Sequence, residues 1–199
     1  GHDEESKKRM AEERDLGPIY GFQWRHFNAQ YESWDSDYTN KGVDQLKHII
    51  ETLKKNPTDR RMIVMAWNPI ALPEMGLPPC HYGFQVTVIG KKLNLLWNQR
   101  SVDVMLGLPF NIASYGLLLH LLAKETDLEE GRLVGFLADT HIYVNHIEGA
   151  KEQIARDPNK YPLPKIKTDS FTSIFDWKYT DSIIENYESY PKINFDIAV

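Results

Sequence analysis

The sequence predicts an α/β (α+β) protein in which helices flank a mixed β-sheet. Helical and strand-like patterns are mixed along the chain, without the strict strand–helix–strand rhythm of a wholly parallel sheet. The 199 residues fit one domain with a sizeable core, and 42% apolar and 26% charged residues are ordinary for a globular protein. We therefore expect a charged, solvated N-terminal segment at 1–14 and one folded domain at 15–199.

The first half of the chain predicts one helix, one buried strand and one hairpin. Apolar residues recur at helical spacing over 43–53, and Pro57 follows where that pattern ends. Residues 62–67 form an apolar run of strand length, which is typical of a strand covered on both faces. Residues 84–88 alternate in polarity, and the chain resumes at 93–101 after a glycine, as in a β-hairpin.

The second half predicts a long helix and further short elements. Asn111 is placed to cap a helix that runs to Leu122. A strand-like run follows at 133–136, and a helix at 145–154. From Leu163 onward, short strand-like pieces alternate with polar loops.

Composition narrows the class of function. The net charge of −5 argues against non-specific binding of DNA, which needs a basic face. One cysteine excludes an internal disulfide and a cysteine-built zinc site. No apolar run approaches the roughly 20 residues that span a bilayer, and the N-terminus has no apolar core of a signal peptide. We expect a cytoplasmic protein that does not enter membranes.

Cys80 is the first candidate for chemistry. A lone cysteine is often only a small buried hydrophobe, but here Pro78-Pro79 hold the chain rigid before it and place it on a loop. A thiol becomes a useful nucleophile when nearby positive charge stabilises the thiolate. His81 or an arginine from elsewhere in the fold would supply that charge, and spacing alone leaves the choice open.

Arginines in two places are candidates for binding an anion. Arg60-Arg61 precede the predicted strand at 62–67, where the bland alternative is a solvated or ion-paired strand end. A guanidinium is also the preferred group for holding a phosphate. Arg100 lies between Gln99 and Ser101, which face the other side of a strand, so one site receives all three only if the strand twists or ends there.

His141 and Tyr143 lie two apart and share one face if their segment is extended, although half-buried packing explains the pair equally well. His141 and His146 have no carboxylate or cysteine beside them, so we expect no metal site. Neither the dinucleotide fingerprint nor the P-loop pattern is found.

Seven motifs together resemble the thymidylate synthase family, in the family's order. They are DLGPIYGFQWR at 15–25, DRR at 59–61, LPPCH at 77–81, QRSVD at 99–103, GLPFNIASY at 107–115, HIYVNH at 141–146 and the closing AV at 198–199. The resemblance therefore runs from about Asp15 to Val199 and implies the family's fold, a large mixed sheet with flanking helices.

The resemblance implies a methyltransferase that converts dUMP to dTMP with 5,10-methylenetetrahydrofolate as co-substrate. Cys80 would add to C6 of the base, Tyr20 would take part in proton removal at C5, and Asn111 would read the uracil edge. Arg100 would favour the thiolate and, with Ser101 and the neighbouring Gln99, would hold the nucleotide.

The resemblance also implies the remaining contacts. His141 and Tyr143 would bind the deoxyribose hydroxyl, and Arg60 and Arg61 would reach the phosphate in the partner subunit of a homodimer. Contacts with the folate would come from Asp103, Leu106, Gly107, Phe110 and Ala198, with the C-terminal tail closing over the cofactor.

Three departures from the family's pattern keep alternatives open. The family has a further N-terminal portion before Leu16, which carries a phosphate arginine, a catalytic glutamate and a tryptophan against the folate. Asn98 stands where a tyrosine is usual, while Val86 and Ala138 replace a common aromatic and a glycine. The alternatives are a deoxyuridylate hydroxymethylase of the same family and a truncated, non-catalytic homologue.

Overall fold

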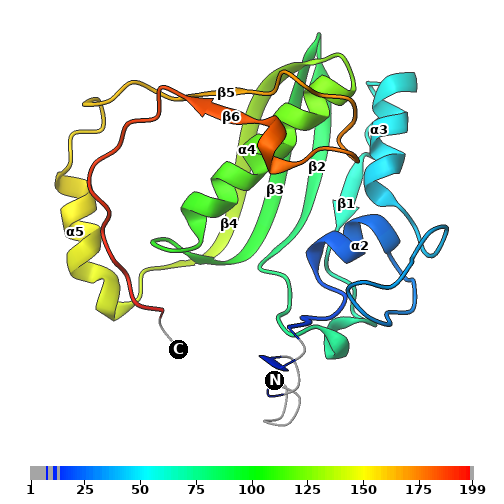
Figure 1. Ribbon diagram of the computed structural model, residues 1–199, viewed down its shortest axis with the longest axis horizontal. Coiled ribbons are helices and arrows are strands. Elements are labelled where there is room, and N and C mark those ends of the chain that lie inside the picture. The colour runs from blue at the N-terminus through cyan, green and yellow to red at the C-terminus, as the bar shows by residue number, and fades with distance from the viewer. Residues whose placement is uncertain (1–7, 9–10, 13, 198–199) are drawn as a thin grey trace.

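A four-stranded mixed sheet forms the centre of the molecule (Figure 1). The computed structural model describes Lys8, Ala11, Glu12 and residues 14–197. The sheet has the order β1 (Ile63–Met65), β2 (His81–Ile89), β3 (Lys92–Asp103) and β4 (Glu129–His141). The first two pairings are antiparallel and β3–β4 is parallel. The predicted fold class, a mixed sheet with flanking helices, is confirmed.

Helices cover one face of this sheet (Figure 1). The structure has α2 (Tyr20–His26), α3 (Gln45–Lys55), α4 (Leu108–Glu125) and α5 (Ile147–Ala155), with 3-10 turns η1 (Leu72–Glu74), η2 (Val144–His146) and η3 (Tyr179–Asp181). α4 is the crossover that makes β3 and β4 parallel, since such strands need a long connection. A small second sheet pairs β5 (Lys165–Lys167) with β6 (Ile183–Glu185).

The predicted elements of the first half are present. In place of the helix predicted over 43–53, α3 begins after Asp44, whose side chain accepts the backbone N–H of Lys47 at 2.9 Å. The predicted strand at 62–67 shortens to the three residues of β1. The hairpin β2–β3 turns at Gly90, whose φ of 64° favours glycine.

The predicted cap of the long helix is wrong. α4 begins at Leu108 rather than after Asn111, and the backbone N–H of Asn111 already donates to the carbonyl of Gly107 at 3.0 Å. Pro109 fits this earlier start because a first-turn residue needs no N–H donor. The Asn111 side chain is therefore free for a tertiary contact.

Elements later in the chain are longer or more divided than predicted. The strand expected at 133–136 extends to the whole of β4. The helix expected at 145–154 begins as η2 and continues as α5. The short strand-like pieces near the end of the chain form β5 and β6.

The hydrophobic core lies between the inner face of the sheet and the helices α3 and α4. Leu93, Leu95 and Trp97 alternate inward along β3, and the Trp97 ring stacks on Tyr115 of α4 at 5.4 Å between centroids. β4 crosses so close to Trp97 that a Cβ atom on Gly135 would overlap the indole ring. The indole is thereby held between a helix and a strand.

The outer face of the sheet carries exposed apolar side chains. Ile63, Gln85, Leu96 and Val134 lie opposite one another across the four strands and so form one row on this face. Ile63 and Val134 are 48% and 44% exposed, and Phe136 of β4 is 64% exposed. A row of this kind marks a surface suited to protein contact.

The charged N-terminal segment falls largely outside the described residues. Of its members, Lys8 and Glu12 are exposed and lie 3.8 Å apart as an ion pair. Among the residues that the structure describes, no helix is long and apolar enough to cross a membrane.

Candidate active site

One edge of the sheet gathers most of the predicted site residues. The parallel strands β3 and β4 end there together, with Asp103 opposite His141. β2 runs the other way and begins at the same edge, so His81 lies opposite Gln99. Cys80 immediately precedes β2. Ligand sites in sheets of this kind form where strand ends meet.

Arg100 holds the loop that carries Cys80. Its Nε donates to the carbonyl of Pro79 and its Nη2 to that of Pro78, each at 3.0 Å. Its backbone N–H donates to the carbonyl of Cys80 at 2.8 Å. The free, half-buried Cys80 thiol therefore lies on a loop fixed by a permanent positive charge.

Tyr20 reaches the same cysteine from α2. Its hydroxyl oxygen accepts the backbone N–H of Cys80 at 2.9 Å. Burial raises the pKa of Tyr20 above its ordinary value. The hydrogen bond from the Cys80 backbone and the charge of Arg100 oppose this rise, whereas the Cys80 side chain adds to it. A protonated phenol thus lies beside the thiol at neutral pH.

His81 is neutral at physiological pH. Burial lowers its pKa from 6.5 to about 4. Its ring stacks on Tyr20 at 4.2 Å between centroids, and its Nδ1 lies 2.9 Å from the hydroxyl of Tyr115. Of the two cations that the sequence left open, only the Arg100 guanidinium carries a charge next to Cys80 at neutral pH.

Gln99 connects β3 to Asn111 of α4. Its side chain is buried, with 2% of the residue exposed. The Gln99 Nε2 donates to the carbonyl of Ser101 at 3.0 Å and to Asn111 Oδ1 at 2.9 Å. The Gln99 Oε1 accepts the indole N–H of Trp97 at 3.2 Å. The structure thus brings Gln99 and Asn111 together, and the backbone carbonyl of Ser101 accepts a hydrogen bond from the same Gln99 side chain.

The Asp103 carboxylate orders the turn between β3 and α4. Its Oδ1 accepts the backbone N–H groups of Met105 and Leu106 at 3.0 and 3.2 Å. Gly107 occupies the N-cap position of α4, and Phe110 in the first turn is 72% exposed. Three predicted folate-binding residues thus lie together with Asp103 beside the Cys80 edge.

His141 and Tyr143 lie at the end of β4. Their rings meet edge to face at 5.1 Å, and His141 Nδ1 lies 3.3 Å from Asp139 Oδ1. Throughout the described part of the chain, no group of three or more His, Cys, Asp or Glu residues is placed to hold a metal ion.

The predicted contribution of Arg60 and Arg61 is not at this edge. Arg60 and Arg61 are exposed and precede β1, which pairs with the middle of β2, so this chain does not bring them to Cys80. Arg61 instead pairs with Asp59, with Nη2 3.0 Å from Oδ2, and these hydrogen bonds lower the pKa of Asp59. Ala198 lies outside the described residues.

Comparison with known proteins identifies the family. The profile of the thymidylate synthase family matches residues 5–199. The chain belongs to this family.

Several relatives with curated names are about 50% identical to this chain over the aligned residues. It is 50% identical to a thymidylate synthase of Saccharomyces cerevisiae, over 93% of this chain and 64% of that protein. It is also 50% identical to a thymidylate synthase of Homo sapiens, over 94% of this chain and 60% of that protein. It is also 53% identical to a bifunctional dihydrofolate reductase-thymidylate synthase of Paramecium tetraurelia, over 94% of this chain and 40% of that protein. The chain thus spans less than two thirds of the length of these relatives.

Sequence reasoning missed three aromatic residues of the site. Trp67 lies under the Arg100 guanidinium at 5.5 Å, Tyr115 contacts His81, and Trp97 donates to Gln99. Only Trp97 had a signal in the sequence, because it lies two residues before Gln99 and therefore on the same face of β3. The other two contacts depend on tertiary packing.

The segment that leads to the C-terminal tail is anchored to η2 and α5. The ring of Phe195 lies against Gly149, where any Cβ atom would overlap it. His146 is fully buried, and its Nε2 donates to the carbonyl of Asp196 at 2.7 Å. The tail is therefore fixed at Asp196 before it reaches Ala198.

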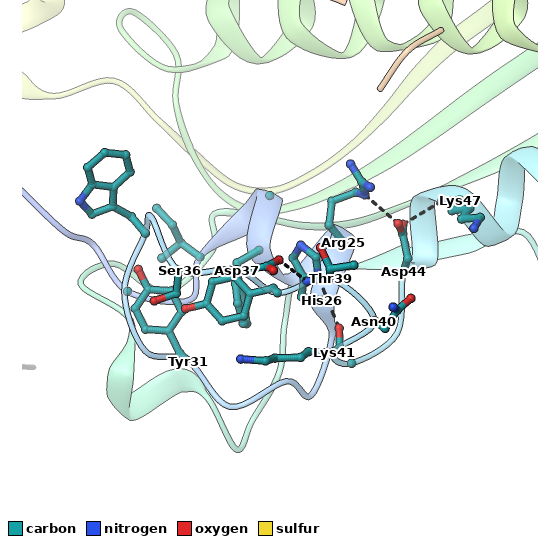
Figure 2. Close-up of a pocket in the computed structure, with 17 residues that line it drawn as sticks. Arg25, His26, Tyr31, Ser36, Asp37, Thr39, Asn40, Lys41, Asp44 and Lys47 are labelled. Atoms are coloured by element: carbon teal, nitrogen blue, oxygen red, sulfur yellow. Dashed lines mark hydrogen bonds and ion pairs between the residues drawn. The ribbon is translucent and has the colours of Figure 1, made fainter. Parts of the chain in front are cut away.

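A cavity of about 980 Å³ lies beside α2 (Figure 2). Phe22, Arg25 and His26 of α2 line it together with the loop that follows, whereas none of the predicted site residues does. Its Arg25 is paired with Asp44 at 2.9 Å, and Lys41 with Glu32 at 3.3 Å. With its cations already paired, this cavity is a poor anion site.

Proposed function

We propose that the complete protein is a thymidylate synthase, a methyltransferase that converts dUMP to dTMP with 5,10-methylenetetrahydrofolate. The observation that carries the proposal is the Cys80 loop. Cys80 is a free cysteine on a loop that Arg100 holds through the Pro79 carbonyl and that a protonated Tyr20 holds through the Cys80 backbone N–H, at the edge of the sheet near Asn111. The curated names of the relatives support this activity rather than a hydroxymethylase.

The chemistry begins with the Cys80 thiolate, which Arg100 stabilises. Sulfur bonds to C6 of the base, and the C5–C6 π electrons move toward O4, which makes C5 nucleophilic. C5 then bonds to the one-carbon unit of the folate as the bond from that carbon to one folate nitrogen breaks. C5 loses its proton in a step assisted by Tyr20, and the bond from the one-carbon unit to the second folate nitrogen breaks, which leaves an exocyclic methylene on C5. Hydride from the folate reduces the exocyclic methylene, Cys80 leaves, and dTMP and dihydrofolate result.

Asn111 reads the base in this proposal. Uracil presents N3–H as a donor and O4 as an acceptor, which a carboxamide complements with its oxygen and its nitrogen. The Asn111 oxygen accepts one hydrogen bond from Gln99 and keeps a second lone pair for N3–H. Asn111 Nδ2 then donates to O4.

The remaining roles follow the positions of side chains around the edge. Arg100 and Ser101 hold the phosphate, and His141 and Tyr143 bind the deoxyribose hydroxyl. Asp103, with Leu106, Gly107, Phe110 and Ala198, contacts the folate. The clustering of the first four of these folate residues supports that assignment. No step needs a metal, because the thiol itself generates the carbon nucleophile.

The protein acts as a homodimer in the cytoplasm, where a reducing environment keeps Cys80 free. The exposed row of Ile63, Leu96 and Val134 supports a second copy on the outer face of the sheet. Arg60 and Arg61 precede β1 at the end of that strand that lies further from Cys80 of their own chain, which supports a role in the neighbouring site.

The test is covalent trapping with 5-fluoro-dUMP. Fluorine at C5 cannot leave as a cation, so the reaction stalls after C5 has bonded to the folate carbon. Mass spectrometry of the complete polypeptide with methylenetetrahydrofolate should show an adduct at Cys80, and the Cys80→Ser variant should show none. Absence of the adduct in the parent would reject the mechanism. Formation of dihydrofolate from dUMP separates the synthase from a hydroxymethylase, which forms none.

A further inference from the structure

Trp97 is connected to Asn111, the proposed base-reading residue, by two hydrogen bonds that share Gln99. Its indole Nε1–H donates to Gln99 Oε1 at 3.2 Å, and Gln99 Nε2 donates to Asn111 Oδ1 at 2.9 Å. Trp97 and Gln99 are 5% and 2% exposed, so water does not compete for these groups. The three side chains form a hydrogen-bonded relay that runs from the core to the half-buried Asn111 at the site.

The two ends of Gln99 have fixed polarity. An indole N–H is only a donor, and the Ser101 carbonyl, which accepts from Gln99 Nε2 at 3.0 Å, is only an acceptor. The Gln99 carboxamide must therefore place its oxygen at Trp97 and its nitrogen at Ser101. The second hydrogen of that nitrogen is directed at Asn111, which must therefore accept it with its side-chain oxygen.

The orientation of Asn111 follows from this polarity. Rotating its carboxamide by half a turn would set the NH₂ groups of Gln99 and Asn111 against each other as two donors with no acceptor between them. With the oxygen committed to Gln99, the Asn111 nitrogen is the group that donates outward. A base with an acceptor at its position 4 fits, and one with an amino group there does not.

We infer that Trp97 is a specificity-determining positioning residue, which sets the uracil-over-cytosine preference of the site by orienting Asn111 through Gln99. The indole is itself held in place, since it stacks on Tyr115 and lies against Gly135. The inference rests on the proposed function and names how its substrate class is chosen.

Trp97→Phe tests the relay, because phenylalanine keeps the aromatic stack and removes the N–H. Trp24→Phe is the matched control, because the Trp24 indole packs 6.4 Å from the same Tyr115 and its buried Nε1 has no hydrogen-bond partner among the described residues. We expect the ratio of kcat/KM for dCMP to that for dUMP to rise roughly tenfold in Trp97→Phe, as for the loss of one buried hydrogen bond, and to stay unchanged in Trp24→Phe. Equal ratios in the two variants would overturn the inference.

A spectroscopic arm keeps the test independent of turnover and of the folding of either variant. In the parent protein, the indole N–H proton of Trp97 should resonate downfield of that of Trp24, because only the former is hydrogen-bonded. A Trp97 proton no further downfield than that of Trp24 would overturn the relay. A parent that turns over neither nucleotide but shows the shift would reject the proposed function and leave the relay standing.

Discussion

Because His81 is neutral in the folded protein, the free energy of unfolding should decrease as the pH is lowered from 6.5 to about 4. The pKa of His81 is 6.5 in the unfolded chain and about 4 in the fold, because the ring is buried between Tyr20 and Tyr115. Above the higher value both states are neutral and no pH dependence arises. Between the two values only the unfolded state binds the proton, so the free energy of unfolding decreases as the pH falls.

The magnitude follows from the two pKa values. Linkage gives a slope of about 1.4 kcal/mol for each tenfold rise in proton concentration, and thus a total loss of about 3.5 kcal/mol across the window. Below the folded pKa the loss is complete and the slope returns to zero. A loss of this size is a large fraction of the stability of an ordinary domain.

The assay compares the parent with His81→Asn, whose carboxamide can still accept the Tyr115 hydroxyl proton but does not titrate. Urea unfolding is followed by tryptophan fluorescence from about pH 8 to about pH 4.5, at one protein concentration. Other titrating groups cancel in the difference between the two unfolding free energies. That difference should be constant above about pH 6.5 and should fall below it. A flat difference would refute the assignment of a neutral, buried His81.

Two further variants test the assignments of the site. Asn111→Asp should lower kcat/KM for dUMP by about ten- to a hundredfold and raise the dCMP to dUMP ratio, because the carboxylate still accepts from Gln99 but loses the donor for O4; an unchanged ratio in steady-state assays would count against base reading. Mixing Cys80→Ser subunits with Arg61→Ala subunits should restore roughly a quarter of parental turnover, since half of the dimers are mixed and one site in each is complete. If native mass spectrometry shows exchange and turnover stays at the level of the two variants alone, the shared site is rejected.

Sequence patterns over a few residues predicted the elements whose structure depends on neighbouring residues alone. The helical stripe before Lys55 and the left-handed turn at Gly90 were both predictable, because periodicity and glycine placement act over a few residues. The start of α4 was not, because Asn111 is a good cap by residue type. Its carboxamide is used by Gln99 across the β3–α4 interface, a contact that no local pattern encodes.

Some features of the candidate site could likewise be predicted from the sequence, and others needed the tertiary structure. The loop position of Cys80 and the placement of Gln99 and Arg100 on opposite faces of a strand were readable from the residues. The choice between His81 and Arg100 as the charged neighbour of the thiol needed the burial of the histidine, which depends on Tyr115 arriving from α4.

The close passage of β4 over the Trp97 ring also constrains how this sequence can change over generations. A side chain at position 135 and an indole at position 97 would occupy the same space, so a side chain added at 135 meets a steric barrier as long as position 97 keeps its indole. The two positions should therefore drift as a pair: lineages that place a smaller residue at 97 gain room for a side chain at 135, and lineages that retain tryptophan keep the glycine. Because position 97 also orients Gln99, a substitution on β4, remote from the nucleotide, becomes permissive for a change in the group that faces the base.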